Sequence, residues 1–251
     1  MNSHRNKLFL HFGPGGNPLI DKEIISDDSV HFWHQPGYNN HESYISFLIK
    51  STEDEIKRMH EACGEQVDLI AHSFGAFIAM NLNQSTKQLI KKYTFIAPTF
   101  SFQDAIVNLV SRVSSHESQY NILETVDNFK NDQTPEKFWE MFQAFSTKYP
   151  DYLKFYWSLE ENYSKYLILC SKYPELDEST LVRATNELIL GHKKLLLDYD
   201  RIDSETLVYL GEFDPLVSEE QIKEIKFFFG DKAVQILATG HFPHLETKII
   251  F

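Results

Sequence analysis

The sequence predicts an α/β fold in which a mostly parallel central sheet is flanked by helices and interrupted by an inserted helical region. Short apolar runs that end at Gly or Pro alternate with segments of helical periodicity over the first hundred residues. Between residues 102 and 200, aromatic and charged residues recur at helical spacing, and strand-like runs return after residue 205. Strands that alternate with helices favour parallel pairing through crossover helices.

The individual elements follow from the same patterns. Strands are expected at residues 7–12, 29–33, 67–71, 93–97, 205–210 and 233–237. Helices are expected at residues 42–62, 76–82 and 219–229, and in the first of these Ile45, Leu48, Ile56 and Met59 are three, eight and three residues apart, which places them on one helix face. We therefore expect residues 1–100 and 201–251 to form a core and residues 101–200 to form an inserted helical cap or lid.

Composition and charge exclude several classes of protein. A formal net charge of -12 and a pI of about 5.3 disfavour binding to nucleic acid or to an anionic membrane surface. The apolar stretch near the N-terminus is too short for a signal peptide, and no segment approaches the roughly 20 apolar residues of a membrane span. Two cysteines suit a reducing compartment and have no metal-binding spacing, so the sequence predicts a cytoplasmic location.

The stretch AHSFGA, residues 71–76, joins an expected strand to an expected helix and contains a serine at position 73. A nucleophile on a sharp strand-to-helix turn needs small neighbours, and Ala71, Gly75 and Ala76 meet that need. A serine at a helix start is also a common N-cap, which is the alternative for Ser73. Other parts of a catalytic site have to decide between the two.

A glycine-rich turn follows the first expected strand, in HFGPGG at residues 11–16. Acyl transfer needs backbone N–H donors that face a developing oxyanion, and such a turn can present them. Pro14 has no N–H and is excluded as a donor. An ordinary turn is the alternative for this segment.

An acid and a histidine follow the last two expected strands. Asp214 lies in GEFDP at residues 211–215, where an acid can orient a histidine, although Asp-Pro also forms simple turns and Glu212 is a rival. His241 lies in GHFPHLE at residues 240–246, where it can act as a general base because histidine exchanges protons near neutral pH.

Serine, aspartate and histidine in this chain order, each after a strand, resemble the α/β-hydrolase superfamily over residues 7–100 and 205–251. HFGPGG is similar to the His-Gly-Gly-Pro-Gly-Gly oxyanion loop of proline iminopeptidase-like members, with Phe12 in place of a glycine. That resemblance implies that Gly13 and Phe74 supply the N–H groups of an oxyanion hole. GHFPHLE resembles the family's Gly-His-x-Pro segment, which selects His241 over His244 as the base.

The segment HFWHQPG, residues 31–37, resembles the strand and loop of the same family that end in Gln-Pro-Gly. His31 and His34 are three apart on an expected strand and so face opposite sides, which argues against a metal site there. We expect neither a metal nor a cofactor.

The resemblance implies a serine hydrolase in which Ser73 attacks a carbonyl carbon, His241 acts as the base and Asp214 orients it. The expected substrate is a small-molecule carboxylic ester or thioester, free or bound to a carrier, and the oligomeric state is left open. A serine in the nucleophile position argues against dehalogenase or epoxide-hydrolase chemistry, for which the superfamily uses an aspartate.

Three alternatives remain open. An aminopeptidase of the proline iminopeptidase kind needs acids that hold a free amino group, and candidates for those acids are Glu136, Glu140, Glu160 and Glu161. A carbon–carbon bond hydrolase with the same triad is the second, and a ligand-binding protein that kept the fold without catalysis is the third.

The expected cap is rich in aromatic residues, and these either line an acyl pocket or pack the cap against the core. They are Phe138, Trp139, Phe142, Phe145, Tyr149, Tyr152, Phe155, Tyr156 and Trp157.

Overall fold

The computed structural model describes residues 6–25, 27–37, 43–115, 120–173, 178–191, 196 and 199–249. Its six strands are β1 (Lys7–Leu10), β2 (Val30–Trp33), β3 (Val67–His72), β4 (Ile90–Ile96), β5 (Glu205–Gly211) and β6 (Val234–Leu237). They form one sheet in the order β2-β1-β3-β4-β5-β6, and all five neighbouring pairs are parallel. The order reverses at β1, which pairs with both β2 and β3, so a crevice is expected at the carboxyl ends of these strands.

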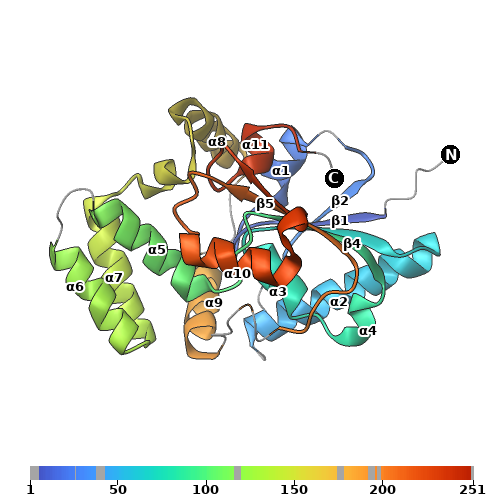
Figure 1. The fold of residues 1–251 in the computed structure, drawn as a ribbon, viewed down its shortest axis with the longest axis horizontal. Coiled ribbons are helices and arrows are strands. Elements are labelled where there is room, and N and C mark those ends of the chain that lie inside the picture. The colour runs from blue at the N-terminus through green and yellow to red at the C-terminus, as the bar shows by residue number, and fades with distance from the viewer. Residues whose placement is uncertain are drawn as a thin grey trace.

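Helices cover both faces of the sheet and fill the connections. They are α1 (Pro18–Ile24), α2 (Tyr44–Cys63), α3 (Phe74–Met80), α4 (Gln84–Lys87), α5 (Phe102–Ser115), α6 (Tyr120–Asn131), α7 (Pro135–Lys148), α8 (Glu160–Lys172), α9 (Glu178–Gly191), α10 (Glu219–Phe229) and α11 (Pro243–Glu246). Two short 3-10 helices, η1 (Tyr152–Tyr156) and η3 (Asp231–Ala233), complete the description. In Figure 1, α1, α8 and α11 lie on one side of the sheet and α2, α3 and α4 lie on the other.

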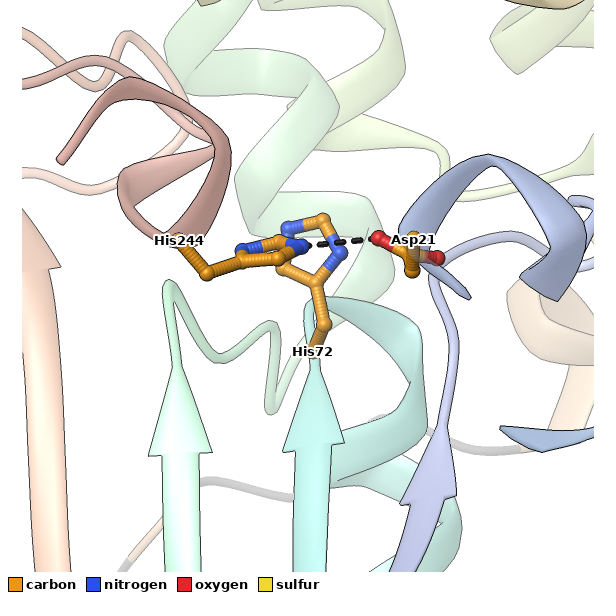
Figure 2. A group of neighbouring side chains, drawn as sticks. All are labelled: Asp21, His72 and His244. Atoms are coloured by element: carbon orange, nitrogen blue, oxygen red, sulfur yellow. Dashed lines mark hydrogen bonds and ion pairs between the residues drawn. The ribbon is translucent and has the colours of Figure 1, made fainter. Parts of the chain in front are cut away.

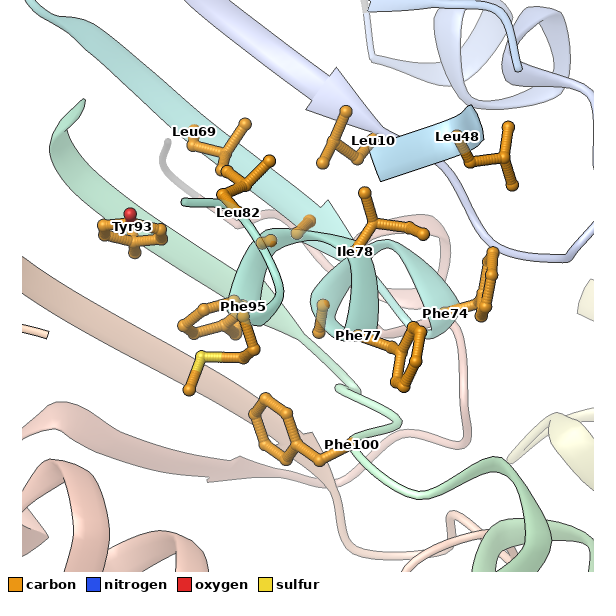
Figure 3. Packing of buried hydrophobic residues seen from close by; sticks show 14 of the residues in the cluster. Leu10, Leu48, Leu69, Phe74, Phe77, Ile78, Leu82, Tyr93, Phe95 and Phe100 are labelled. Carbon is orange, nitrogen blue, oxygen red and sulfur yellow. The ribbon is translucent and has the colours of Figure 1, made fainter. Parts of the chain in front are cut away.

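The main hydrophobic core lies between the sheet and α3. Figure 3 shows Phe77 and Ile78 of α3 beside the sheet, with Leu10, Leu69 and Phe95 projecting from the strands. All seven residues of α3 are buried, which its small and apolar composition allows. This burial fixes the position of the turn that precedes α3.

The helices between β4 and β5 have a hydrophobic core of their own. Leu109, Phe129, Phe138, Met141 and Phe145 are almost fully buried in it. Figure 1 shows α5, α6 and α7 to the left of the sheet, beyond the ends of its strands. The division into a core and a cap at residues 100 and 201 stays a prediction.

Some predicted boundaries differ from the observed ones. The sequence patterns do not predict α1, β1 ends two residues before residue 12, and β4 begins three residues before residue 93. Residue 42, the predicted start of the first expected helix, which corresponds to α2, lies outside the described residues. Within the described part of the chain, no helix has both the length and the apolar character required to cross a bilayer.

Candidate active site

Four loops that follow strands meet at the carboxyl edge of the sheet. β1 leads into the glycine-rich loop of residues 11–17, β3 leads into Ser73, β5 leads into Asp214, and β6 leads into His241. Parallel strands place these ends on one edge, so residues far apart in sequence become neighbours. The sequence-predicted residues therefore share one region of the molecule.

Ser73 occupies a strained turn between β3 and α3. Its φ of 51° and ψ of -117° lie outside the regions that a non-glycine residue ordinarily adopts. Its side chain makes no hydrogen bond to the start of α3, so the N-cap alternative is wrong. A Cβ at Gly75 would lie 2.5 Å from the carbonyl oxygen of Leu10, so the turn needs glycine there.

A continuous chain of hydrogen bonds joins the three candidate catalytic side chains. His241 Nε2 lies 2.8 Å from Ser73 Oγ, and His241 Nδ1 lies 2.8 Å from Asp214 Oδ2. Because a carboxylate only accepts, Nδ1 carries the proton and Nε2 is left to accept from the serine hydroxyl. All three side chains are buried, which strengthens these interactions.

Asp214 is itself held in place by its surroundings. Its second carboxylate oxygen, Oδ1, accepts a hydrogen bond of 2.9 Å from the backbone N–H of Leu216. Arg112 of α5 donates to the backbone carbonyl of Asp214 at 2.9 Å. The rival acid, Glu212, is exposed, and the rival histidine, His244, pairs with Asp21. The structure thus brings together Asp214 and His241 and leaves both rivals out.

The glycine-rich loop is shaped by its glycines and by Gln35. Gly13 has a φ of +131°, and a Cβ there would lie 2.7 Å from the nitrogen of Gly15. The amide oxygen of buried Gln35 accepts the Gly15 N–H at 3.0 Å, and its amide nitrogen reaches the Phe12 carbonyl at 3.4 Å. Gln35 belongs to the Gln-Pro-Gly segment, so that segment holds the loop in position.

Gly13 and Phe74 line the same cavity as Ser73 and His241. Phe74 is the first residue of α3, and the N–H groups of a first helical turn have no acceptor within the helix. That the N–H groups of Gly13 and Phe74 form an oxyanion hole stays a prediction.

The cavity at Ser73 has a volume of about 240 Å³ and a mainly apolar lining. Several aromatic residues from the inserted helices line it: Phe138, Trp139, Phe142, Tyr152, Tyr156 and Trp157. Phe145, Tyr149 and Phe155 instead pack within the helices' own core. Among the described residues that line the cavity, none is Asp, Glu, Lys or Arg.

Thr99, Tyr156 and Glu246 make contacts around the site that the sequence patterns do not predict. Thr99 Oγ1 lies 3.3 Å from Ser73 Oγ, and Thr99 N–H donates to the Ser73 carbonyl at 3.1 Å. The backbone carbonyl of Tyr156 accepts a hydrogen bond from the backbone N–H of His241. Burial raises the pKa of the Tyr156 hydroxyl well above its usual value. Glu246 accepts from Gly240 N–H at 2.7 Å and from the Ser158 N–H at 3.0 Å, so it ties the His241 loop to the inserted region.

The four acids proposed for an aminopeptidase lie away from the cavity. Glu136, Glu140, Glu160 and Glu161 are all exposed. Glu140 pairs with Lys137 at 2.7 Å, and Glu161 pairs with Lys165 at 2.9 Å.

One group among the described residues has the composition of a metal site. Asp21, His72 and His244 are buried, and each offers a ligand atom within 4.8 Å of the other two. His31 and His34 do not form a second group, because His31 pairs with Glu55 at 2.8 Å and His34 is exposed.

Comparisons with known proteins agree with the fold. A family model described as the alpha/beta hydrolase fold matches residues 49–248, and the chain belongs to this family. The predicted fold class and the family resemblance are thereby confirmed. Comparison with curated proteins found no match.

Solved structures similar to this chain include enzymes of different activities. A proline iminopeptidase-related protein from Thermus thermophilus has a TM-score of 0.70 and 19% identity, over 98% of this chain and 85% of that one. An esterase from Exiguobacterium antarcticum has a TM-score of 0.57 and 13% identity, over 96% of this chain and 86% of that one. An epoxide hydrolase from Bacillus megaterium has a TM-score of 0.55 and 17% identity, over 96% of this chain and 88% of that one. Identities this low support the shared fold alone, so the chemistry has to come from the site.

Proposed function

We propose that this chain is a serine hydrolase that cleaves a carboxylic ester or thioester with an uncharged, largely apolar acyl group. The observation that carries the proposal is the unbroken series of hydrogen bonds from Ser73 through His241 to Asp214, beside an apolar cavity. An ester or thioester needs only a nucleophile, a base and an oxyanion site, and this region contains candidates for each.

In the first half of the reaction, Ser73 Oγ attacks the carbonyl carbon while His241 Nε2 takes the hydroxyl proton. The tetrahedral intermediate collapses, and His241 returns that proton to the departing alcohol or thiol. In the second half, His241 takes a proton from water as the water oxygen attacks the acyl carbon. When this second tetrahedral intermediate collapses, the bond to Ser73 Oγ breaks, the acid is released, and His241 returns the proton to Ser73 Oγ. Asp214 orients the imidazole and stabilises its charged form throughout.

The oxyanion of each tetrahedral intermediate would be stabilised by the N–H groups of Gly13 and Phe74. Both residues line the cavity at Ser73, and the loop that contains Gly13 is held by Gln35. Donors fixed before the reaction stabilise the developing charge without reorganising, and loss of one such donor typically costs about 10²- to 10³-fold in kcat.

The acyl group would lie against the aromatic residues of the inserted helices, which we propose act as a cap. A cavity of about 240 Å³ accepts a short alkyl chain or a single aromatic ring. Its apolar walls favour an uncharged group, because an unpaired charge is costly to bury. If the acyl group is bound to a carrier, the carrier would remain outside the cavity.

The uncharged lining counts against the aminopeptidase alternative. A free α-amino group needs an acidic partner, and the four candidate acids are exposed and outside the lining. Epoxide hydrolysis is disfavoured by chemistry, because a serine that opened an epoxide would form an ether, which water does not cleave under these conditions. A carboxylate nucleophile forms an ester, which water does cleave.

A non-catalytic binding protein remains the alternative of another class. A fold alone does not establish catalysis. The strained backbone at Ser73 and its bond to His241 are costly features with no use in simple binding.

We further propose a cytoplasmic location, with small molecules rather than nucleic acids or membranes as partners. The support comes from the net charge of -12 and from a chain with only two cysteines, Cys63 in α2 and Cys170 in α8.

The experiment is hydrolysis of p-nitrophenyl esters of increasing acyl length beside proline p-nitroanilide, with wild type, Ser73→Ala and His241→Ala. We expect ester turnover with an optimum at short or aromatic acyl groups, and its loss in both variants. Turnover of the proline amide in preference to the esters would favour the aminopeptidase. A wild type that hydrolyses none of these and does not react with a fluorophosphonate probe would favour the binding protein.

A further inference from the structure

Behind the triad lies a second group of buried polar side chains, Asp21, His72 and His244 (Figure 2). Each belongs to a segment that contains a candidate catalytic group. His72 directly precedes Ser73, and His244 lies in the helix that follows His241. Asp21 lies in α1, which follows the glycine-rich loop. The group therefore connects three separate catalytic segments.

His72 bonds directly to the main chain of the proposed base. Its Nε2 lies 2.9 Å from the carbonyl oxygen of His241. Because a carbonyl oxygen only accepts, Nε2 must carry a proton. Burial holds the pKa of His72 well below its usual value, so the ring is neutral and Nδ1 is unprotonated. His72 is thus fixed in one tautomer, which donates to the loop that contains His241.

Asp21 and His244 form the second link. Asp21 Oδ1 lies 2.7 Å from His244 Nε2, although the two residues are 223 positions apart in sequence. Both side chains are fully buried, and burial raises the pKa of the Asp21 carboxyl while the bond to His244 lowers it. The ring of His244 lies edge-on to that of His72, with 4.6 Å between their centroids. Figure 2 shows the three side chains converging from a strand and two helices.

Burial of these polar groups costs folding free energy. Asp21 Oδ2, His72 Nδ1 and His244 Nδ1 are buried and have no hydrogen-bond partner among the described residues. Unpartnered buried polar atoms destabilise a fold, and apolar side chains would fill the same space without that cost. The presence of these residues is therefore explained better by the segments that they hold in place than by a contribution to stability.

Binding of one metal ion fits the geometry less well. Asp21 Oδ1 and His244 Nε2 already bond to each other at 2.7 Å, and His72 Nε2 bonds to the His241 carbonyl oxygen at 2.9 Å, so three of the candidate ligand atoms are already engaged.

We propose that Asp21, His72 and His244 form a positioning network that holds the His241 loop so that His241 Nε2 faces Ser73 Oγ. None of the three touches the reacting atoms, so they are positioning residues. The proposal rests on the proposed serine hydrolase function, and it deepens that function by explaining what aligns the base with the nucleophile.

The test compares variants of His72. His72→Met removes the donor at similar volume, whereas His72→Gln retains a donor the same number of bonds from the backbone. The matched control is His31→Gln, the same substitution at a histidine that pairs with Glu55 in another part of the fold. Rates on the best ester are divided by the fraction of chains that a fluorophosphonate labels, and thermal melting reports folding.

We expect His72→Met to lower kcat by about 10- to 100-fold with little change in KM, because a small misplacement of a catalytic group costs this much. We expect His72→Gln to recover most of that loss, and His31→Gln to match wild type. A His72→Met enzyme with wild-type kcat would overturn the proposal. So would a His72→Met enzyme whose only change is a lower melting temperature.

Side-chain NMR tests the network without any turnover. In wild type we expect His72 as the neutral tautomer protonated at Nε2, and a protected downfield proton on His241 Nδ1. In His72→Met and Asp21→Asn we expect that downfield proton to exchange faster with water. An unchanged proton, or one equivalent of bound metal that Asp21→Asn loses, would overturn the proposal. If wild type reacts with no fluorophosphonate, the proposed function fails while the NMR signals still decide the network.

Discussion

The strand ends and the helices between β4 and β5 contribute differently to the candidate site. The strand ends supply Ser73, Asp214 and His241, and residues 168 positions apart meet at 2.8 Å because the sheet fixes where each strand ends. The inserted helices have their own core and supply much of the cavity wall. If the proposed function holds, the strand ends supply the chemistry and the inserted helices supply the selectivity, so variants in the two regions should have different effects.

The largest effect should come from the acid at the end of β5. We expect Asp214→Asn to lower kcat by about 10³- to 10⁴-fold, because an amide no longer favours the His241 tautomer that accepts from Ser73. Glu212→Gln is the matched control, since Glu212 lies two residues away and is exposed. Steady-state kinetics on the best ester measures both. Equal losses in the two variants would show that Asp214 has no special role.

The next largest effect concerns the glycine-rich loop. We expect Gly13→Ala to lower kcat by about 10²-fold or more, because a methyl group there collides with the Gly15 nitrogen and moves a proposed oxyanion donor. Gly37→Ala is the control, because a Cβ at Gly37 would have no heavy atom of the described residues within 4 Å. Steady-state kinetics on the best ester compares the two. Wild-type turnover in Gly13→Ala would contradict the assignment of this loop.

A smaller effect should follow from changes in the inserted helices. We expect Phe142→Ala to move the acyl-chain optimum to longer chains, with kcat/KM for the original best ester reduced by about 10-fold, since a methylene in an apolar pocket is worth about 1–3 kcal/mol. Phe155→Ala is the control, because Phe155 packs in the helical core and does not line the cavity. If kcat/KM depended on acyl-chain length in the same way in Phe142→Ala and Phe155→Ala, the aromatic side of the cavity would not select the acyl group.

A fourth effect concerns stability against acid rather than turnover. Burial lowers the pKa of His11 to about 3, so below pH 6.5 the unfolded chain binds a proton that the folded chain does not. Stability therefore falls as the pH drops from 6.5 towards 3, by up to about 1.4 kcal/mol per pH unit for this histidine. Urea unfolding of wild type and His11→Asn at several pH values measures the slope. A slope that does not become shallower in the variant would contradict this account.

Much of the fold was predictable because its strands are short apolar runs with clear ends. The exceptions have local causes. β4 begins at Ile90, but Lys91 and Lys92 follow near the amino end of the strand and hide the strand pattern. α1 begins at Pro18 after an Asn17 cap, and both are helix-start signals that the neighbouring glycines obscured.

The candidate triad was predictable for the same reason, since each member lies within a few residues of the end of a strand. The contacts around the triad were not predictable. Thr99 resembles an ordinary loop residue in sequence, and the resemblance of the Gln-Pro-Gly segment does not say that Gln35 holds the glycine-rich loop. The bond between Asp21 and His244 joins positions 223 residues apart. Contacts of that kind depend on how the chain folds back on itself, which spacing and periodicity do not encode.

Activation of Ser73 by His241 and Asp214 is measured most directly by the intact mass of the protein after reaction with a fluorophosphonate, followed by peptide mapping. We expect one adduct per chain, on Ser73, formed rapidly by wild type and at least about 10³-fold more slowly by His241→Ala. An unlabelled wild type, or an adduct on another residue, would contradict this activation.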